Sequence, residues 1–124
     1  MAPEITIHRW DQIEHEELGP KIARRAVHAD RMTIARIYVK KGGVVPTHQH
    51  EHEQVSYVLE GRLLFDFGDR EEIVSGGEMM QIPSQQPHRV EALEDSVALD
   101  IFQPVRDDWL RGDDSYLRNP SPSP

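Results

Sequence analysis

The feature that most constrains the fold is a series of short strand-like segments between residues 21 and 103. Each segment alternates apolar and polar side chains or is largely apolar, and glycine, proline or acidic residues separate it from the next. Short strands joined by such turns are typical of jelly rolls and small barrels. The segments are KIARRAVHA, MTIARIYVK, VVPTHQH, QVSYVLE, RLLFDF, EEIVS, MMQIP, HRVEAL and SVALDIF. The pattern predicts an all-β fold.

The length of 124 residues predicts one domain, because a chain of this size builds one modest core. We expect this domain to span residues 1–117, with residues 1–20 as an N-terminal arm that carries little strand signal. The segment RDDWLRG near the end predicts one short helical turn. The tail 118–124 is rich in proline and serine, a composition typical of disorder.

Charge and composition exclude several classes of partner and chemistry. The formal net charge of -8 argues against nucleic acid and anionic membranes as partners, because proteins bind both through a surplus of Lys and Arg. A small-molecule ligand is favoured instead. The chain has no cysteine, so any metal must bind histidine, carboxylate or amide oxygen. No apolar run approaches the roughly 20 residues of a membrane span, and the N-terminus has no apolar signal segment. We expect a cytoplasmic protein.

Four of the seven histidines lie in HQHEH and at position 88. In an extended segment residues two apart project from the same face, so His48 and His50 can point at one ion. Gln54 begins the next strand and offers an amide oxygen, and His88 arrives from another strand through the turn IPSQQPH. Three imidazoles and one neutral oxygen suit one divalent metal ion: Ni, Zn, Fe, Mn or Co. The alternative is that HQHEHE is a solvated polar loop.

The spacing around these residues favours the metal site. Gly42, His48, His50, Gln54 and Gly61 are separated by five, one, three and six residues, which resembles the first motif of the cupin family. Gly77, five residues and Pro83, followed by His88, resemble the second motif, and 15 residues separate Gly61 from Gly77. The resemblance covers Gly42 to about Ala92 and implies the cupin fold, a double-stranded β-helix or jelly-roll barrel.

Three positions depart from the cupin motifs. Gln54 replaces the usual glutamate and makes the ligand set neutral, which leaves a bound metal a stronger Lewis acid and more attractive to an anionic substrate. Gln85 replaces a glycine in the turn, and Ala92 replaces an asparagine. His52 and Glu53 are rival ligands, which the motif assigns to a turn.

Asp100 interrupts the apolar segment VALDIF. Strand parity puts Asp100 on one face with Phe102, and it puts Val97, Leu99 and Ile101 on the other. If the aliphatic face packs between the sheets, Asp100 and Phe102 point into the barrel beside the metal. The alternatives are an Asp100–Arg106 ion pair, or an aspartate that accepts hydrogen bonds from backbone N–H groups.

A closer resemblance extends over most of residues 10–110. The stretches HEQVSYVLEG and DIFQPVRDDWL are similar to the KdgF-type cupins of pectin and alginate degradation. That resemblance implies conversion of 4,5-unsaturated monouronates to linear 5-keto-4-deoxyuronates. It also implies that Asp100 and Arg106 are catalytic and that Phe102 and Arg106 bind the substrate. For Phe102 the alternative is a core residue.

The chemistry of these side chains fits an anionic sugar. The planar fork of Arg106 can pair with a uronate carboxylate, and Asp100, desolvated and with a raised pKa, can move protons.

The competing functions are an iron or manganese dioxygenase and a non-catalytic sugar- or metabolite-binding cupin. Arg36 and Gln81 are expected at the surface. We also expect a homodimer that pairs through edge strands.

Overall fold

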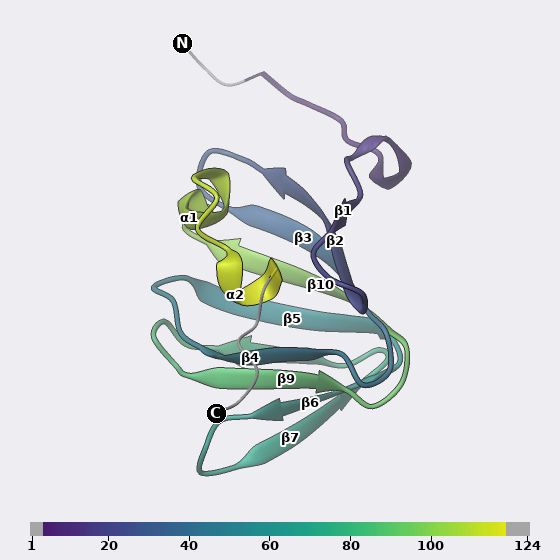
Figure 1. The fold of residues 1–124 in the computed structure, drawn as a ribbon. Coiled ribbons are helices and arrows are strands. Elements are labelled where there is room, and N and C mark those ends of the chain that lie inside the picture. The colour runs from purple at the N-terminus through teal and green to yellow at the C-terminus, as the bar shows by residue number, and fades with distance from the viewer. Residues whose placement is uncertain (1–3, 119–124) are drawn as a thin grey trace.

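The structure is a computed structural model, and it describes residues 4–118. Two antiparallel sheets lie face to face, and the two short α-helices lie together at one side of them (Figure 1). The elements are η1 (Trp10–Gln12), β1 (Glu16–Glu17), β2 (Ile22–His28), β3 (Thr33–Val39), β4 (Val44–His48), β5 (Glu53–Glu60), β6 (Arg62–Asp66), β7 (Glu71–Ser75), β8 (Met79–Ile82), β9 (His88–Ala92), β10 (Ser96–Gln103), α1 (Asp107–Leu110) and α2 (Ser115–Arg118).

The strand order is that of a jelly roll. One sheet has six strands in the order β1-β2-β3-β10-β5-β8, and the other has four in the order β4-β9-β6-β7. The chain crosses between the sheets after β3, β4, β5, β7, β8 and β9, so segments far apart in sequence meet inside the barrel. The all-β prediction is confirmed, and each of the expected strand segments corresponds to one strand of the structure, with β5 and β10 each one residue longer than expected.

The core lies between the two sheets. Ala35, Val58 and Ala98 project into it from the six-stranded sheet, and Leu63 and Phe65 project into it from the four-stranded sheet; all five are buried. These residues alternate with more exposed positions along β3, β5, β6 and β10, which is the period of a half-buried strand. The burial of one face of each sheet fixes the register of the strands.

Tight turns keep the strands short. Gly61 joins β5 to β6 with a φ of 89°, where a side chain is strained. A Cβ at this position would also lie 2.5 Å from the carbonyl oxygen of Asp95. Gly61 is therefore required both by the backbone angle and by the closeness of the loop between β9 and β10.

The two ends of the described chain are more structured than the sequence indicates. In the expected arm, β1 pairs with β2, and Leu18 is buried in the core. The expected helical turn is α1, and α2 follows it and includes Arg118. The rest of the expected tail, residues 119–124, lies outside the described residues. Across residues 4–118 we find no helix with the length and hydropathy of a membrane span.

Candidate metal and substrate site

Three imidazoles meet between the sheets. His48, the last residue of β4, lies directly opposite His88, the first residue of β9, and His50 follows in the loop toward β5. One ring nitrogen from each lies within 4.8 Å of the others. The four-stranded sheet thus supplies two of the imidazoles, and the adjoining loop supplies the third.

Backbone carbonyl groups orient two of these rings. Nδ1 of His48 lies 2.8 Å from the carbonyl oxygen of Pro46, and Nδ1 of His88 lies 2.8 Å from that of Gln86. A carbonyl oxygen can only accept, so Nδ1 carries the hydrogen in both rings and Nε2 is left with its lone pair. Histidine ligands of metal ions are commonly held in this way.

Burial keeps the imidazoles neutral. The pKa of His48 is lowered to about 4, mainly by desolvation and to a smaller extent by the neighbouring His88. The pKa of His50 is lowered to about 3, mainly by desolvation and to a smaller extent by the positive charge of Arg106. Near neutral pH these rings therefore present lone pairs, the form that binds a metal.

Gln54 completes the group from the six-stranded sheet. Its Oε1 lies 3.1 Å from Nε2 of His50, and its Nε2 donates to Oγ of Ser56 at 2.9 Å. Ser56 in turn donates to Oδ1 of Asp100 at 2.7 Å. Because Ser56 gives its one hydrogen to the carboxylate, it must accept from the amide nitrogen, and the amide oxygen faces the imidazoles. The donors of His48, His50, Gln54 and His88 fit one divalent ion with a neutral ligand set.

Asp100 faces the interior of the barrel. It lies opposite Ser56 of β5 and Ala35 of β3, both fully buried, and it lines the same small cavity as His48 and His88. Protein surrounds the carboxyl group, and the cavity leaves it partly accessible. Burial raises its pKa to about 6, against the opposing effect of the Ser56 hydrogen bond and of Arg106. A carboxyl group with this pKa can both give and take a proton near neutral pH.

The aliphatic face of β10 does not pack between the sheets. Val97, Leu99 and Ile101 are half-buried on the outer face of the six-stranded sheet, where Leu99 lies opposite Arg36 and Tyr57. The inner face is instead formed by Ala98, Asp100 and Phe102. The assumption about the aliphatic face was wrong, but Asp100 and Phe102 do point inward.

Arg106 pairs with Asp108, so the alternative of an Asp100–Arg106 ion pair is not formed. Its Nε and Nη2 donate to the two carboxylate oxygens of Asp108 at 3.0 and 2.8 Å. The guanidinium carbon lies 4.6 Å from the ring centre of Phe102 and 4.4 Å from that of Trp109. Phe102 thus supports Arg106, and both residues also line the cavity with Asp100.

The comparisons with known proteins agree with this geometry. The cupin domain family matches residues 35–102. A pectin degradation protein, KdgF of Dickeya dadantii (strain 3937), is 30% identical over 103 residues, which are 81% of this chain and 94% of that protein. The protein is a KdgF-like cupin.

Solved structures support the same relationship. The structure of KdgF from a Halomonas species has a TM-score of 0.74 and 30% sequence identity, and the match covers 80% of this chain and 94% of that one. An RmlC-like cupin from Shewanella frigidimarina NCIMB 400 has a TM-score of 0.79 and 24% identity, covering 86% of this chain and 96% of that one. The second match shows the cupin fold alone.

Gln85 stands where the second cupin motif usually has glycine, and it keeps the backbone conformation of that turn. Its φ of 65° is in the left-handed region, and its N–H donates to the carbonyl oxygen of His50 at 2.7 Å. This hydrogen bond joins the turn before His88 to the loop that carries His50. The substitution therefore keeps the turn conformation that brings the two imidazoles together.

The rival ligands contribute no donor atom to the group that the three imidazoles of this cupin form. His52 packs against Phe102 and His50, and its Nε2 lies 3.9 Å from Oδ1 of Asp107. Glu53 is exposed at the start of β5. Neither has a ligand atom within the group that His48, His50 and His88 form.

Sequence reasoning missed three residues of the site. Ser56 shares the inward face of β5 with Gln54, so the period of the strand contained a signal for it. Asp108 follows Arg106 by two residues and could have been recognised as its partner. Tyr116, on α2, stacks on His48 with 4.6 Å between ring centres, and no motif of the sequence marks it.

Proposed function

We propose that this cupin is a metal-dependent enzyme that opens the ring of 4,5-unsaturated monouronates and yields linear 5-keto-4-deoxyuronates. Its relative from Dickeya dadantii is named a pectin degradation protein. The observation that carries the proposal is the position of Asp100, a carboxyl group that shares one small cavity with His48, Gln54 and His88. Uronates from pectin or from alginate would present the same reacting group.

The reaction is an isomerisation that moves one proton and breaks one bond. The anomeric hydroxyl at C1 loses its proton, and the bond between C1 and the ring oxygen breaks to give an aldehyde. The electrons of that bond go to the ring oxygen, which becomes the enol oxygen on C5. Protonation of C4 then converts the enol to the ketone. The reaction needs a group that accepts a proton and returns one.

Asp100 is suited to this exchange. Its pKa of about 6 places a carboxylate in most molecules at neutral pH, ready to take the hydroxyl proton, while the acid form stays accessible for delivery to C4. The hydrogen bond from Ser56 holds one carboxylate oxygen, so the other is directed to the substrate. One positioned carboxyl group therefore serves as base and as acid.

The ligand set complements this carboxyl group. His48, His50, Gln54 and His88 would hold the metal ion, which when bound supplies a Lewis acid that stabilises negative charge developing on substrate oxygen. The neutral ligand set leaves the full charge of the ion to attract an anion. Asp100, across Ser56 from Gln54, provides the proton transfer that imidazole ligands cannot.

Arg106 would bind the uronate carboxylate. Its Nε and one hydrogen of Nη2 are used by Asp108, and Nη1 makes no hydrogen bond within the part of the chain that the structure describes. The Nη1 and Nη2 end of the guanidinium is thus the edge on which a carboxylate can form two parallel hydrogen bonds. Phe102 holds the guanidinium in place and excludes water on that side.

Anaerobic turnover tests the proposal. The enol ether of an unsaturated monouronate absorbs in the ultraviolet, and this absorbance should fall under nitrogen when protein loaded separately with Ni, Zn, Fe, Mn or Co is added. Asp100→Asn should lower the rate by about a hundredfold or more while the metal is retained. A strict requirement for oxygen would point to a dioxygenase. Binding of the uronate without turnover for any metal would point to a non-catalytic cupin.

A further inference from the structure

The cavity between the sheets is too small for a sugar. It measures about 50 Å³, whereas pockets for small molecules measure about 300 Å³ or more. His48, Asp100 and Arg106 thus face a space much smaller than a monosaccharide needs. Part of the lining must move before a uronate can reach them.

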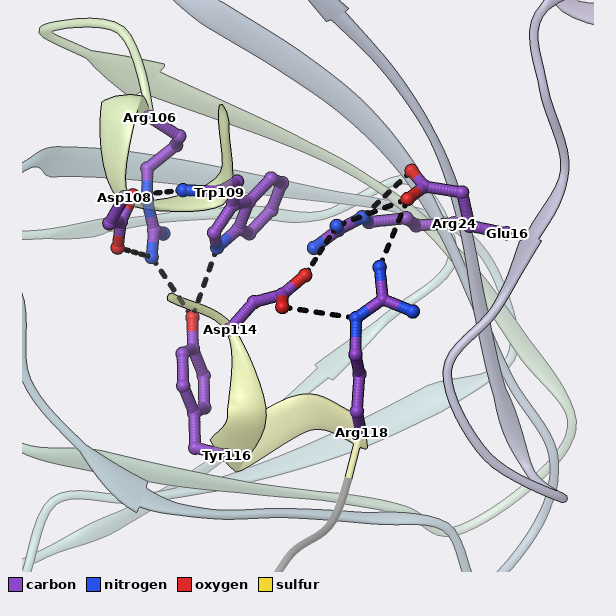
Figure 2. A network of polar contacts seen from close by, with 8 residues as sticks. All are labelled: Glu16, Arg24, Arg106, Asp108, Trp109, Asp114, Tyr116 and Arg118. Carbon is purple, nitrogen blue, oxygen red and sulfur yellow. Dashed lines mark hydrogen bonds and ion pairs between the residues drawn. The ribbon is translucent and has the colours of Figure 1, made fainter. Parts of the chain in front are cut away.

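The side chain of Tyr116 occupies the space that a sugar would need beside His48 and Arg106. Its ring stacks on His48 with 4.6 Å between centres and 27° between planes. Its hydroxyl accepts hydrogen bonds from Nη2 of Arg106 at 2.9 Å and from Nε1 of Trp109 at 3.3 Å (Figure 2). The side chain of Tyr116 therefore covers His48, a candidate metal ligand, and at the same time takes up a hydrogen-bond donor of Arg106.

The hydroxyl of Tyr116 lies at the carboxylate-binding edge of Arg106. Asp108 already takes Nε and one hydrogen of Nη2, so the hydrogen that Tyr116 accepts is the other one on Nη2, on the side that faces Nη1. A substrate carboxylate that bound this edge would need the same hydrogen. Tyr116 and such a carboxylate exclude each other.

We propose that α2 is a lid and that Tyr116 occupies the place of the substrate carboxylate until an anionic sugar displaces it. The nature of the ligand rests on the proposed function, but the lid does not. Binding then requires α2 to swing away, which frees the edge of Arg106 and opens the cavity above His48. The bound anion replaces the hydroxyl on Arg106, so opening and binding are coupled.

The part of the cavity lining that lies on strands is less able to move. His48, His88, Asp100 and Phe102 belong to strands whose backbones are hydrogen-bonded to neighbouring strands. By contrast, α2 has four residues and belongs to neither sheet. A segment attached mainly through side chains is the one that opens at the lowest cost in free energy.

A group of charged side chains latches the lid. Asp114, directly before α2 and 2% exposed, accepts from Nη2 of Arg24 at 2.6 Å and from Nε of Arg118 at 3.0 Å. Glu16 of β1 accepts from both arginines, at 3.1 Å from Arg24 and 3.2 Å from Arg118 (Figure 2). Trp109 lies between this latch and Arg106, with Arg24 stacked at 4.3 Å from its ring.

Removal of a metal ion by a chelator tests the lid without any sugar. Zinc-loaded protein is mixed with excess dipicolinate, and the rate of zinc loss is compared between Asp114→Asn, Tyr116→Phe and the neighbouring control Asp113→Asn. Asp113 is exposed and pairs only with the exposed Arg111 among the described residues. We expect zinc loss about tenfold faster in Asp114→Asn and severalfold faster in Tyr116→Phe, because each loses a hydrogen bond to a charged group. Rates equal to that of Asp113→Asn in both variants would overturn the lid.

Binding of D-galacturonate, a saturated uronate, tests the competition at Arg106. In a Trp10→Phe background Trp109 is the only tryptophan, and galacturonate should increase its quenching by acrylamide as α2 leaves. Tyr116→Phe should bind galacturonate severalfold more tightly than the parent protein. Weaker binding would show that the hydroxyl assists the ligand, and it would overturn the proposal. Because neither measurement uses turnover, a failure of the proposed reaction leaves both results readable, and Tyr116→Phe avoids any folding defect of Asp114→Asn.

Discussion

Replacing Asp100 by asparagine should stabilise the metal-free protein at neutral pH, even though it removes the proposed acid-base group. Burial raises the pKa of Asp100 from 3.8 to about 6. Between these two values the folded protein keeps a proton that the unfolded chain releases, so the free energy of unfolding falls as the pH rises. At about 1.36 kcal/mol for each pH unit, the loss is about 3 kcal/mol once the pH exceeds 6. Below pH 3.8 the carboxyl group is protonated in both states and the loss is absent.

Asparagine has nearly the same shape and does not titrate. Its side-chain oxygen can still accept the hydrogen bond from Ser56, so the main change is the removal of the ionisation cost. The stability difference between Asp100→Asn and the parent protein should be near zero at pH 4 and should reach about 3 kcal/mol at pH 7.5.

Urea denaturation followed by circular dichroism, in the presence of a chelator, measures this difference. The chelator is needed because a metal bound to the folded state would add its own stabilisation. Asp69→Asn, at an exposed turn, is the matched control and should show no difference at either pH. A parent protein that is as stable as Asp100→Asn at pH 7.5 would refute the reasoning about the buried carboxyl group.

Three further predictions concern the site and the assembly. His88→Ala should reduce bound metal from about one ion per chain to a small fraction, measured by elemental analysis after dialysis, because three donors hold a divalent ion much less tightly. Arg106→Lys should raise KM for the unsaturated uronate by about tenfold or more and leave metal content unchanged, since lysine cannot form two parallel hydrogen bonds; an unchanged KM would remove Arg106 from the substrate site. Light scattering should give twice the chain mass of 14.3 kDa, and a monomer would refute the expected homodimer.

The strands were predictable because their signals are local. Alternating side chains mark each strand, and glycines such as Gly61 mark the turns, so the sequence contains both the elements and their ends. The grouping of His48, His50, Gln54 and His88 was likewise predictable from strand parity and from the spacing of the cupin motifs. Their roles as metal ligands stay a prediction.

The parts that could not be predicted depend on contacts between distant segments. Asp114 meets Arg24 across 90 positions of sequence, and Tyr116 reaches His48 from a helix of four residues. No periodicity marks such contacts, because a helix this short shows no amphipathic pattern. The outward position of Leu99 was missed for a related reason: an apolar strand has no polar face to indicate which side is buried.

The origin of the proton at C4 tests the central claim most directly. Metal-loaded protein is allowed to convert an unsaturated monouronate in deuterium oxide, and the product is examined by NMR at early times, before free exchange beside the ketone. If Asp100 delivers the proton inside the barrel, one deuterium should appear at C4 in a single configuration. Equal amounts of both configurations, formed at an undiminished rate by Asp100→Asn, would contradict the account.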